Sequence, residues 1–382
     1  MQGKGKERNS MVSPNRYFSY NASMGERVVV AMSGGVDSSA AAMLLVEQGY
    51  EVIGIFMRTG VSSSWSDTGT CCSLQDAEDA REVARTLGIR FHVINFDVEF
   101  QQLIDFFCRE YAIGRTPNPC IICNRDFKFG RLISFADALN ATHVATGHYA
   151  RTYFERGRFM MGKAADSRKD QSYVLFCLTQ SQLSRALFPL GNLTKQEVRQ
   201  LAARGGLRIR DKAESEDICF VPDRNYRRLI RERMPDAMTP GPIKSVAGEI
   251  LGTHPGIQFF TVGQRHGLGI AAGRPLYVVR IEAESHSVIV GDKKDLLSPG
   301  LMANGVNWVS ASSAKEAAVC QVQIRYQHRP APASLEETGP AEVRVIFEEP
   351  QPAVTPGQAA VFYRDDLLLG GGWIAAAIPR NA

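Results

Sequence analysis

The sequence lacks long apolar runs, a marked excess of one charge and the cysteine density of a disulfide-bonded scaffold. Its 382 residues contain no run of about 18 apolar residues, which excludes a membrane-spanning helix. Lysine and arginine exceed aspartate and glutamate by only four, 44 against 40, so a polyanionic partner is compatible but not required. Eight cysteines without a secretory signal are expected to be reduced thiols, and we therefore expect a cytoplasmic protein with no membrane partner.

The composition is that of a globular protein of several domains. The hydrophobic fraction of 44% and the charged fraction of 22% are close to globular averages. At roughly 150 residues per domain, the length predicts two or three domains. Residues 1–26 are polar and lack the apolar core of a secretory signal, so we expect a disordered leader there.

Residues 27–217 alternate between apolar strand patterns and helical stripes, which predicts an α/β domain built on a parallel sheet with helices on both faces. The functional loops should then lie at the carboxyl ends of the strands. The predicted strands are Arg27–Met32, Glu51–Met57, Ile89–Phe96 and His143–Thr146, and the helical segments between them include 37–48, 77–87, 100–111 and 131–139.

Strands and turns dominate the rest of the chain. Residues 218–286 are expected to form a small central domain, since proline and glycine interrupt every helical pattern there. Residues 287–382 contain alternating strand patterns at 320–326, 341–347 and 359–363. This spacing predicts a C-terminal all-β domain, either a small barrel or a sandwich.

The segment Ser33–Ser39, SGGVDSS, lies between the first predicted strand and the first predicted helix. Its glycines allow backbone N–H groups to approach a polyanion, and the helix N-terminus adds partial positive charge. The segment lacks the lysine of a Walker A loop and the spacing of a dinucleotide-binding turn. It therefore predicts a pyrophosphate-binding loop. Asp37 is expected either to help bind ATP, through Mg²⁺, or to cap the helix.

Three cysteines have sequence contexts that suggest chemistry. Cys120 and Cys123 form a single C-x-x-C pair, which is weak support for structural zinc because no second pair of suitable spacing follows. Cys123 precedes Asn124, a good helix N-cap, and a thiol at a helix N-terminus favours its reactive thiolate form. Cys219 follows nearly a hundred residues later on an apolar segment predicted as a strand, where it would ordinarily be a core residue.

Six segments in order resemble the bacterial tRNA-specific 2-thiouridylase family, within the PP-loop ATP pyrophosphatases. They are SGGVDSS, 115–130 (RTPNPCIICNRDFKFG), 145–151 (ATGHYAR), 169–173 (KDQSY), 215–220 (SEDICF) and 263–275 (GQRHGLGIAAGRP). The resemblance implies a PP-loop fold, adenylation of the C2 oxygen of the wobble uridine by ATP, and replacement of that oxygen by sulfur. Two alternatives stay open: a PP-loop ligase or amidotransferase that passes nitrogen, and an RNA-binding module with a regulatory ATP loop.

The resemblance also implies which residues bind the substrates. The ATP-binding positions are Ala31, Met32, Ser33, Gly34, Gly35, Val36, Asp37, Ser38, Met57 and Gly147. The tRNA-binding positions are Asn118, Pro119, Cys120, His148, Lys169, Asp170, Gln171, Arg325, Tyr326 and Gln358. The implied partners are the tRNAs for lysine, glutamate and glutamine and a relay protein that donates persulfide sulfur.

Two catalytic cysteines follow from the same resemblance. Cys123 is implied as the nucleophile and Cys219 as the carrier of the persulfide, with a transient disulfide between them. Family members often have aspartate at the position of Cys120. The third thiol in this chain leaves a variant open in which Cys120, Cys123 and Cys219 hold a four-iron–four-sulfur cluster. No other metal site is expected.

Overall fold

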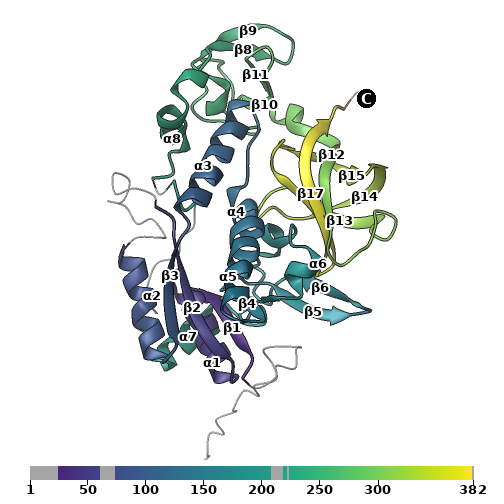
Figure 1. The fold of residues 1–382 in the computed structure, drawn as a ribbon. Helices are drawn as coiled ribbons and strands as arrows, with labels where there is room; N and C mark the ends of the chain where they lie inside the picture. The colour runs from purple at the N-terminus through teal and green to yellow at the C-terminus, as the bar shows by residue number, and fades with distance from the viewer. Residues whose placement is uncertain (1–24, 61–73, 208–217, 222, 381–382) are drawn as a thin grey trace, which may run out of the picture.

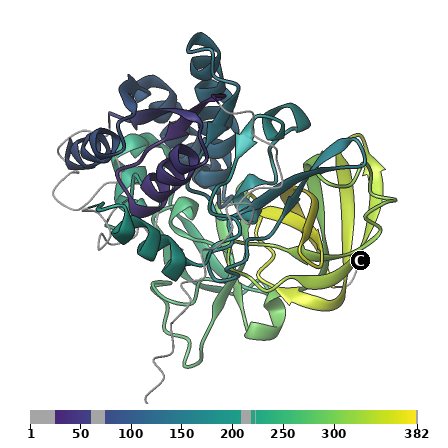
Figure 2. The same cartoon turned by 90° about the horizontal axis from the view of Figure 1, so that it is seen from below.

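The computed structural model describes residues 25–60, 74–207, 218–221 and 223–380, which form three parts. A parallel α/β domain comes first, a small central domain follows, and a β-barrel ends the chain (Figure 1). The barrel lies beside the α/β domain, and the view from below shows the same arrangement (Figure 2). All but the last two residues of the expected leader lie outside the described residues.

Five parallel strands form the sheet of the α/β domain, in the order β3-β2-β1-β4-β7. They are β1 Arg27–Ala31, β2 Glu51–Arg58, β3 Arg90–Asn95, β4 His143–Ala145 and β7 Ala186–Leu187. The first four confirm the predicted strands, whereas β7 is too short to give a recognisable pattern. The carboxyl ends of β1, β2 and β4 meet at one edge, where folds of this kind bind ligands.

Helices cover both faces of this sheet. Val28 and Val30 of β1 enter one hydrophobic cluster, and the alternate residues Val29 and Ala31 enter another on the opposite face. This two-sided burial explains why β1 reads as a continuous apolar run. The helices on the first face are α1 Val36–Glu47, α2 Leu74–Thr86 and α7 Lys195–Arg204, and α5 Leu132–Ala138 covers the second.

The central domain consists of helix α8 and a four-stranded sheet in the order β10-β11-β8-β9. Its elements are α8 Tyr226–Arg233, β8 Gly241–Ser245, β9 Ile250–His254, β10 Tyr277–Glu282 and β11 Ser287–Gly291. Helix α3 (Asp97–Ala112) of the α/β domain extends to this sheet (Figure 1). Phe107 of α3 and Val278 of β10 share one hydrophobic cluster, so a common core joins the two domains.

Six antiparallel strands close into the C-terminal barrel, because β12 pairs with β15 on one side and with β17 on the other. They are β12 Leu297–Trp308, β13 Val319–Gln323, β14 Ala331–Gly339, β15 Glu342–Pro352, β16 Ala359–Arg364 and β17 Leu367–Ile378. The all-β prediction is confirmed, and the closure selects the barrel over the sandwich. The predicted strand 320–326 is too long, because Arg325 and Tyr326 lie in a turn that the His328 N–H closes on the Arg325 carbonyl.

A hairpin from the first part of the chain extends the barrel sheet, which the sequence analysis did not predict. Strands β5 (Arg151–Glu155) and β6 (Arg158–Gly162) flank a two-residue turn, and β6 pairs with β17. The turn residues Arg156 and Gly157 have φ values of 52° and 78°, as a tight hairpin of this length requires. The hairpin therefore connects the α/β domain to the barrel.

Candidate active site

The glycine loop between β1 and α1 requires glycine at its tightest point. Gly34 has φ +71°, and a Cβ atom there would lie 2.3 Å from the Asp76 carbonyl oxygen. Gly35 is the N-cap of α1 and adds no side-chain cap. The N–H groups of the first turn are therefore not covered by a capping side chain, which suits a bound phosphate.

Serine side chains hold this loop in shape. The Ser33 N–H donates to Ser38 Oγ at 3.1 Å, and Ser38 Oγ donates to the Gly35 carbonyl at 3.2 Å. Ser39 Oγ donates to the same carbonyl at 2.9 Å. The loop is thus already ordered before phosphate binds, so binding loses little conformational entropy in the loop.

Asp37, in the first turn of α1, pairs with a lysine that the sequence analysis missed. The Lys195 Nζ atom lies 2.7 and 2.9 Å from the two Asp37 carboxylate oxygens, and the Tyr149 hydroxyl donates to one of them at 2.7 Å. Only 11% of the Lys195 side chain is exposed. Asp37 therefore does not cap α1, and both of its oxygens are already engaged.

The sequence around Lys195 carries a signal that could have revealed this pair. Thr194 and Glu197 form a capping box, which makes Lys195 the first residue of α7. The first turn of a helix carries partial positive charge, so a lysine there is unfavourable unless a carboxylate lies opposite. A lysine directly after the N-cap of a capping box therefore indicates an acidic partner elsewhere in the chain.

Gly147 allows the segment after β4 to touch the phosphate loop. A Cβ atom at Gly147 would lie 2.7 Å from the Asp37 carbonyl carbon and 2.7 Å from the Ser38 nitrogen. Both atoms belong to the backbone of the first turn of α1, which cannot yield as a flexible side chain could. Gly147 therefore fixes the distance between the end of β4 and the loop.

His148, an expected tRNA contact, is buried next to this junction. Only 7% of the residue is exposed, and its Nδ1 atom lies 2.7 Å from Thr146 Oγ1. Burial lowers the pKa of His148 well below its usual value, and the Lys128 ammonium lowers this pKa further. The imidazole is therefore neutral at physiological pH.

The C-x-x-C pair lies on the first turns of a helix that begins earlier than predicted. Asn118 is the N-cap of α4 (Pro119–Ile122), and its side chain accepts a hydrogen bond from the Cys120 N–H at 3.2 Å. The prediction that Asn124 caps this helix is wrong, because proline at the first helical position and Asn118 before it already start the helix. Cys120 therefore occupies the N-terminal turn, and Cys123 follows it.

Asn124 has a different role, which is to anchor the helix. It is 1% exposed, and its Nδ2 atom donates to the Val174 carbonyl at 3.0 Å. Cys123 begins a π-helical segment, η3 (Cys123–Arg131), a rare geometry that is frequent at functional sites. The residue next to Cys123 therefore fixes the position of this segment against the core.

Cys120 is exposed to solvent at the start of α4. Desolvation by the neighbouring protein raises the pKa of its thiol, Cys123 adds to the rise, and Lys128 opposes it. Cys120 is thus a protonated thiol at neutral pH, and the thiol is a much weaker nucleophile than the thiolate.

Cys219 lies in a turn, so the strand predicted for it is wrong. The Val221 N–H donates to the Ile218 carbonyl at 2.8 Å and closes the turn. Phe220 is buried against two phenylalanine rings of α3, with centroids at 5.8 and 5.2 Å. The apolar residues that suggested a strand are the anchors of this turn, and Cys219 is held partly exposed between them.

The structure brings Cys123 and Cys219 to one hydrophobic cluster. Both side chains pack against it, as does Met57 at the carboxyl end of β2. All six cysteines in the described part of the chain are free thiols, and Cys71 and Cys72 lie outside it. The expected disulfide between Cys123 and Cys219 stays a prediction.

The arrangement does not fit the expected metal groups. Within residues 25–60, 74–207, 218–221 and 223–380, no group of three or more His, Cys, Asp or Glu side chains is placed to hold a metal ion. Cys120, Cys123 and Cys219 therefore do not form the thiolate set of an iron–sulfur cluster. Asp37, the expected Mg²⁺ ligand, is engaged by Lys195.

Two of the expected tRNA contacts form hydrogen bonds inside the protein. Asp170 accepts a hydrogen bond from the Ser172 hydroxyl at 2.7 Å, and Gln171 Oε1 accepts one from the Tyr149 N–H at 3.0 Å. Lys169, beside them, is partly exposed. Asp170 and Gln171 therefore support the segment that carries Lys169.

The other expected contacts lie on the barrel side. Tyr326 is 38% exposed, and its ring centroid lies 6.2 Å from that of Tyr173; Arg325 beside it is partly exposed. Gln358 points inward, and its Nε2 atom donates to the Thr116 carbonyl at 2.9 Å. The structure thus places Gln358 against the segment that leads to Asn118 and Pro119.

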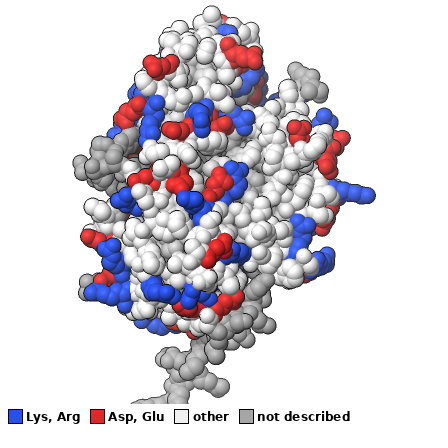
Figure 3. Space-filling view, viewed as in Figure 1, with Lys and Arg blue, Asp and Glu red and all other residues white. Residues whose placement is uncertain are grey.

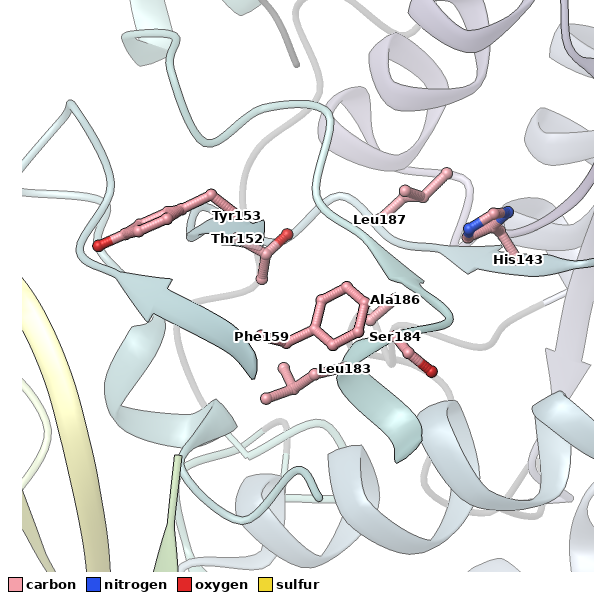
Figure 4. A pocket seen from close by; sticks show the side chains of 8 residues that line it. All are labelled: His143, Thr152, Tyr153, Phe159, Leu183, Ser184, Ala186 and Leu187. Carbon is pink, nitrogen blue, oxygen red and sulfur yellow. The ribbon is translucent and has the colours of Figure 1, made fainter. Parts of the chain in front are cut away.

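The pocket in Figure 4 is separate from these residues. It lies between the β5–β6 hairpin and β7 and contains none of the candidate residues, and it is lined by His143, Thr152, Tyr153, Phe159, Leu183, Ser184, Ala186 and Leu187. Figure 3 shows Lys and Arg interspersed with Asp and Glu over one face, without a continuous basic track. None of the described helices combines the length and apolar character needed to cross a membrane.

Family models and known relatives match the chain along its length. A tRNA methyl transferase HUP domain matches residues 26–223, a tRNA methyl transferase PRC-barrel domain residues 227–292, and an aminomethyltransferase beta-barrel domain residues 298–374. The tRNA-specific 2-thiouridylase MnmA of Geobacter metallireducens is 52% identical over 365 residues, which are 93% of this chain and 98% of that protein. The enzyme of the same name from Geotalea uraniireducens is 50% identical over 360 residues, covering 92% and 96%.

Solved structures match far more weakly. A 4-thiouridine synthetase–RNA complex with bound ATP is 18% identical, has a TM-score of 0.36, and covers 56% of this chain and 51% of its own. A likeness at this level adds nothing to the assignment. The relatives at about half identity over nine-tenths of the chain are sufficient, and they show that the chain belongs to the tRNA-specific 2-thiouridylase family.

Proposed function

We propose that this chain replaces the C2 oxygen of the wobble uridine of tRNA with sulfur, using ATP. The observation that carries the proposal is the packing of Cys123 and Cys219 on one hydrophobic cluster, together with Met57. The preformed glycine loop supplies a phosphate site on the same domain. An enzyme that passes nitrogen needs no pair of thiols, so the packing of both cysteines against one cluster favours sulfur transfer.

Adenylation is the first step. The loop from Ala31 to Ser38 binds the ATP phosphates through backbone N–H groups, and Met57 and Gly147 flank the nucleotide. The uridine C2 oxygen attacks the α-phosphorus, the bond to the bridging oxygen of the β-phosphate breaks, and pyrophosphate leaves. Lys195 neutralises the Asp37 carboxylate, which would otherwise repel the phosphates beside the loop. Any Mg²⁺ is expected on the ATP phosphates, since Asp37 is occupied.

Sulfur transfer follows. The terminal sulfur of a Cys219 persulfide attacks C2, and AMP leaves with the original oxygen. The Cys123 thiolate then attacks the Cys219 sulfur, so that the transferred sulfur stays on C2 as the thiocarbonyl and a Cys123–Cys219 disulfide forms. In a second route Cys123 first releases hydrosulfide from the persulfide, which gives the same disulfide. Both routes need a thiol reductant to restore the two cysteines.

The tRNA is expected along the side where the barrel meets the α/β domain. Lys169 and Arg325 are partly exposed cations that would contact phosphates, and the exposed Tyr326 would stack on a base. Asn118, Pro119 and Cys120 would line the flipped uridine. We propose the tRNAs for lysine, glutamate and glutamine as substrates, a persulfide relay protein as the sulfur donor, and the cytoplasm as the location.

Nucleoside mass spectrometry on tRNA from a thiouridylase-deficient host tests this function. Expression of the wild-type chain should restore 2-thiouridine, and Cys123→Ser or Cys219→Ser should abolish it. Cys320→Ala is the matched control, since this thiol lies in strand β13 of the barrel and should be dispensable. The proposal fails if well-expressed wild-type protein restores no 2-thiouridine in a host with a working sulfur relay, or if the Cys219→Ser variant does.

A further inference from the structure

The segment that leads into the C-x-x-C pair, residues 114–118, is held by two other domains at once. We call it the cysteine loop. On one side it meets residues 355–358 of the barrel, which we call the barrel turn. The Thr116 N–H donates to the Pro356 carbonyl at 2.9 Å, and the Gln358 side chain donates back to the Thr116 carbonyl at 2.9 Å and to the Pro117 carbonyl at 3.4 Å.

This approach is close enough to require glycine in the barrel turn. Gly357 has φ +91°, and a Cβ atom there would lie 2.9 Å from the Thr116 oxygen and 3.0 Å from its nitrogen. The backbone of the barrel turn therefore lies directly against the backbone of the cysteine loop. No flexible side chain separates them, so a displacement of one must displace the other.

The central domain holds the opposite side of the cysteine loop. The Thr116 hydroxyl lies 3.5 Å from the Thr261 hydroxyl. Gly114 has φ +74°, and a Cβ atom there would lie 2.7 Å from the Ile281 side chain. Thr116 is therefore a junction of all three domains, and it lies four residues before Cys120.

The barrel turn is itself tied to the barrel sheet. The Gly357 N–H donates to the Ile374 carbonyl at 2.9 Å, and the Ile374 N–H donates to the Gln358 carbonyl at 2.8 Å. Gln358 is followed directly by strand β16. A shift of the barrel is therefore transmitted through Gln358 to the cysteine loop.

We propose that Gln358 is a positioning residue, which couples the seating of the barrel on tRNA to the placement of Cys120 and Cys123. The inference rests on the proposed function, because it assumes that these cysteines act on the bound tRNA. It departs from the tRNA-contacting role that the family resemblance implies for Gln358. The amide of Gln358 is used inside the protein, on the two carbonyls of the cysteine loop.

The substitution Gln358→Leu tests the proposal, since leucine keeps most of the side-chain bulk and removes both hydrogen bonds. Three quantities are measured: the Kd for unthiolated tRNA, the single-turnover rate of thiolation at saturating tRNA, and the iodoacetamide labelling rates of Cys120 and Cys123 in the free protein. We expect a Kd within about twofold of wild type, a thiolation rate lowered about tenfold or more, and labelling rates changed severalfold. The matched control is Gln351→Leu, because the Gln351 amide donates to the nearby Glu349 carbonyl at 2.8 Å.

A second variant keeps the experiment decisive. Gly357→Ala retains the Gln358 side chain and pushes the barrel turn away from Thr116, and it should lower the same rate without weakening tRNA binding. The proposal is overturned if Gln358→Leu weakens tRNA binding about tenfold while the saturating rate is unchanged, or if neither the rate nor the labelling moves. A wild-type protein that thiolates no tRNA would instead refute the proposed function.

Discussion

The ion pair between Asp37 and Lys195 sets the charge beside the phosphate loop. Asp37 alone would place a negative charge in the first turn of α1, where the ATP phosphates are expected. The Lys195 ammonium contacts both carboxylate oxygens, so the pair is nearly neutral. Tyr149 fixes the carboxylate from a third direction.

Lys195→Met should therefore impair adenylation. Removing the ammonium leaves the Asp37 charge uncompensated beside the incoming phosphates, and we expect tRNA-dependent pyrophosphate release to fall about a hundredfold. The tRNA affinity should stay near that of wild type. Lys315→Met, at an exposed barrel lysine, is the control. Unchanged pyrophosphate release in Lys195→Met would contradict the role given to this pair.

His148 should make the fold sensitive to acid. Its pKa is lowered in the folded protein, so the unfolded chain takes up a proton below about pH 6.5 that the folded protein does not. The neutral imidazole therefore costs no stability above this pH. As the pH falls below it, the free energy of unfolding decreases by at most about 1.4 kcal/mol per pH unit through this group. His143, His254 and His328 also have lowered pKa values, so the test compares two proteins.

The comparison is between wild type and His148→Asn. We expect the variant to lose less unfolding free energy than wild type between pH 7 and pH 5.5, measured by urea denaturation. Equal losses in the two proteins would show that His148 is not the group responsible.

At the scale of elements, close backbone contacts position the site. The end of β4 and the start of α1 touch through Gly147, as the barrel turn and the cysteine loop touch through Gly357. Each contact places two segments at a distance that a side chain would forbid. Helix α4 contributes in another way, since its start at Pro119 places both cysteines on consecutive turns.

Gly147→Ala should displace the phosphate loop. The added methyl group would meet two backbone atoms of α1 at 2.7 Å, and neither can rotate away. We expect a lower melting temperature and a severalfold weaker affinity for ATP, measured by calorimetry. Gly162→Ala is the control, because a Cβ atom there would lie 3.4 Å from its nearest neighbour. ATP affinity that is equal in the two variants would contradict this account of Gly147.

At the scale of the whole molecule, the three domains meet at Thr116, four residues before Cys120. Cys123 comes from the α/β domain, and Cys219 precedes the central domain, whose core it joins. The barrel reaches the same place through Gln358. The proposed sulfur transfer by two thiols would therefore depend on the packing of all three domains.

The sequence predicted the parallel sheet, the phosphate loop and the all-β C-terminal domain, because these depend on local periodicity and on glycine at fixed positions. Prediction from the sequence failed where residues far apart in the chain interact. The Asp37–Lys195 pair and the attachment of the β5–β6 hairpin to β17 join residues far apart in the chain. The turn at Cys219 failed for a related reason, since four apolar residues in a row fit a strand equally well until their burial against α3 is known.

Trapping the disulfide after one turnover tests whether Cys123 and Cys219 carry out the sulfur transfer. Protein carrying a Cys219 persulfide is mixed with ATP and unthiolated tRNA without reductant, quenched with an alkylating agent, and digested for non-reducing mass spectrometry. We expect one linked Cys123–Cys219 peptide pair for each 2-thiouridine formed. Formation of 2-thiouridine while both cysteines remain free for alkylation would contradict it.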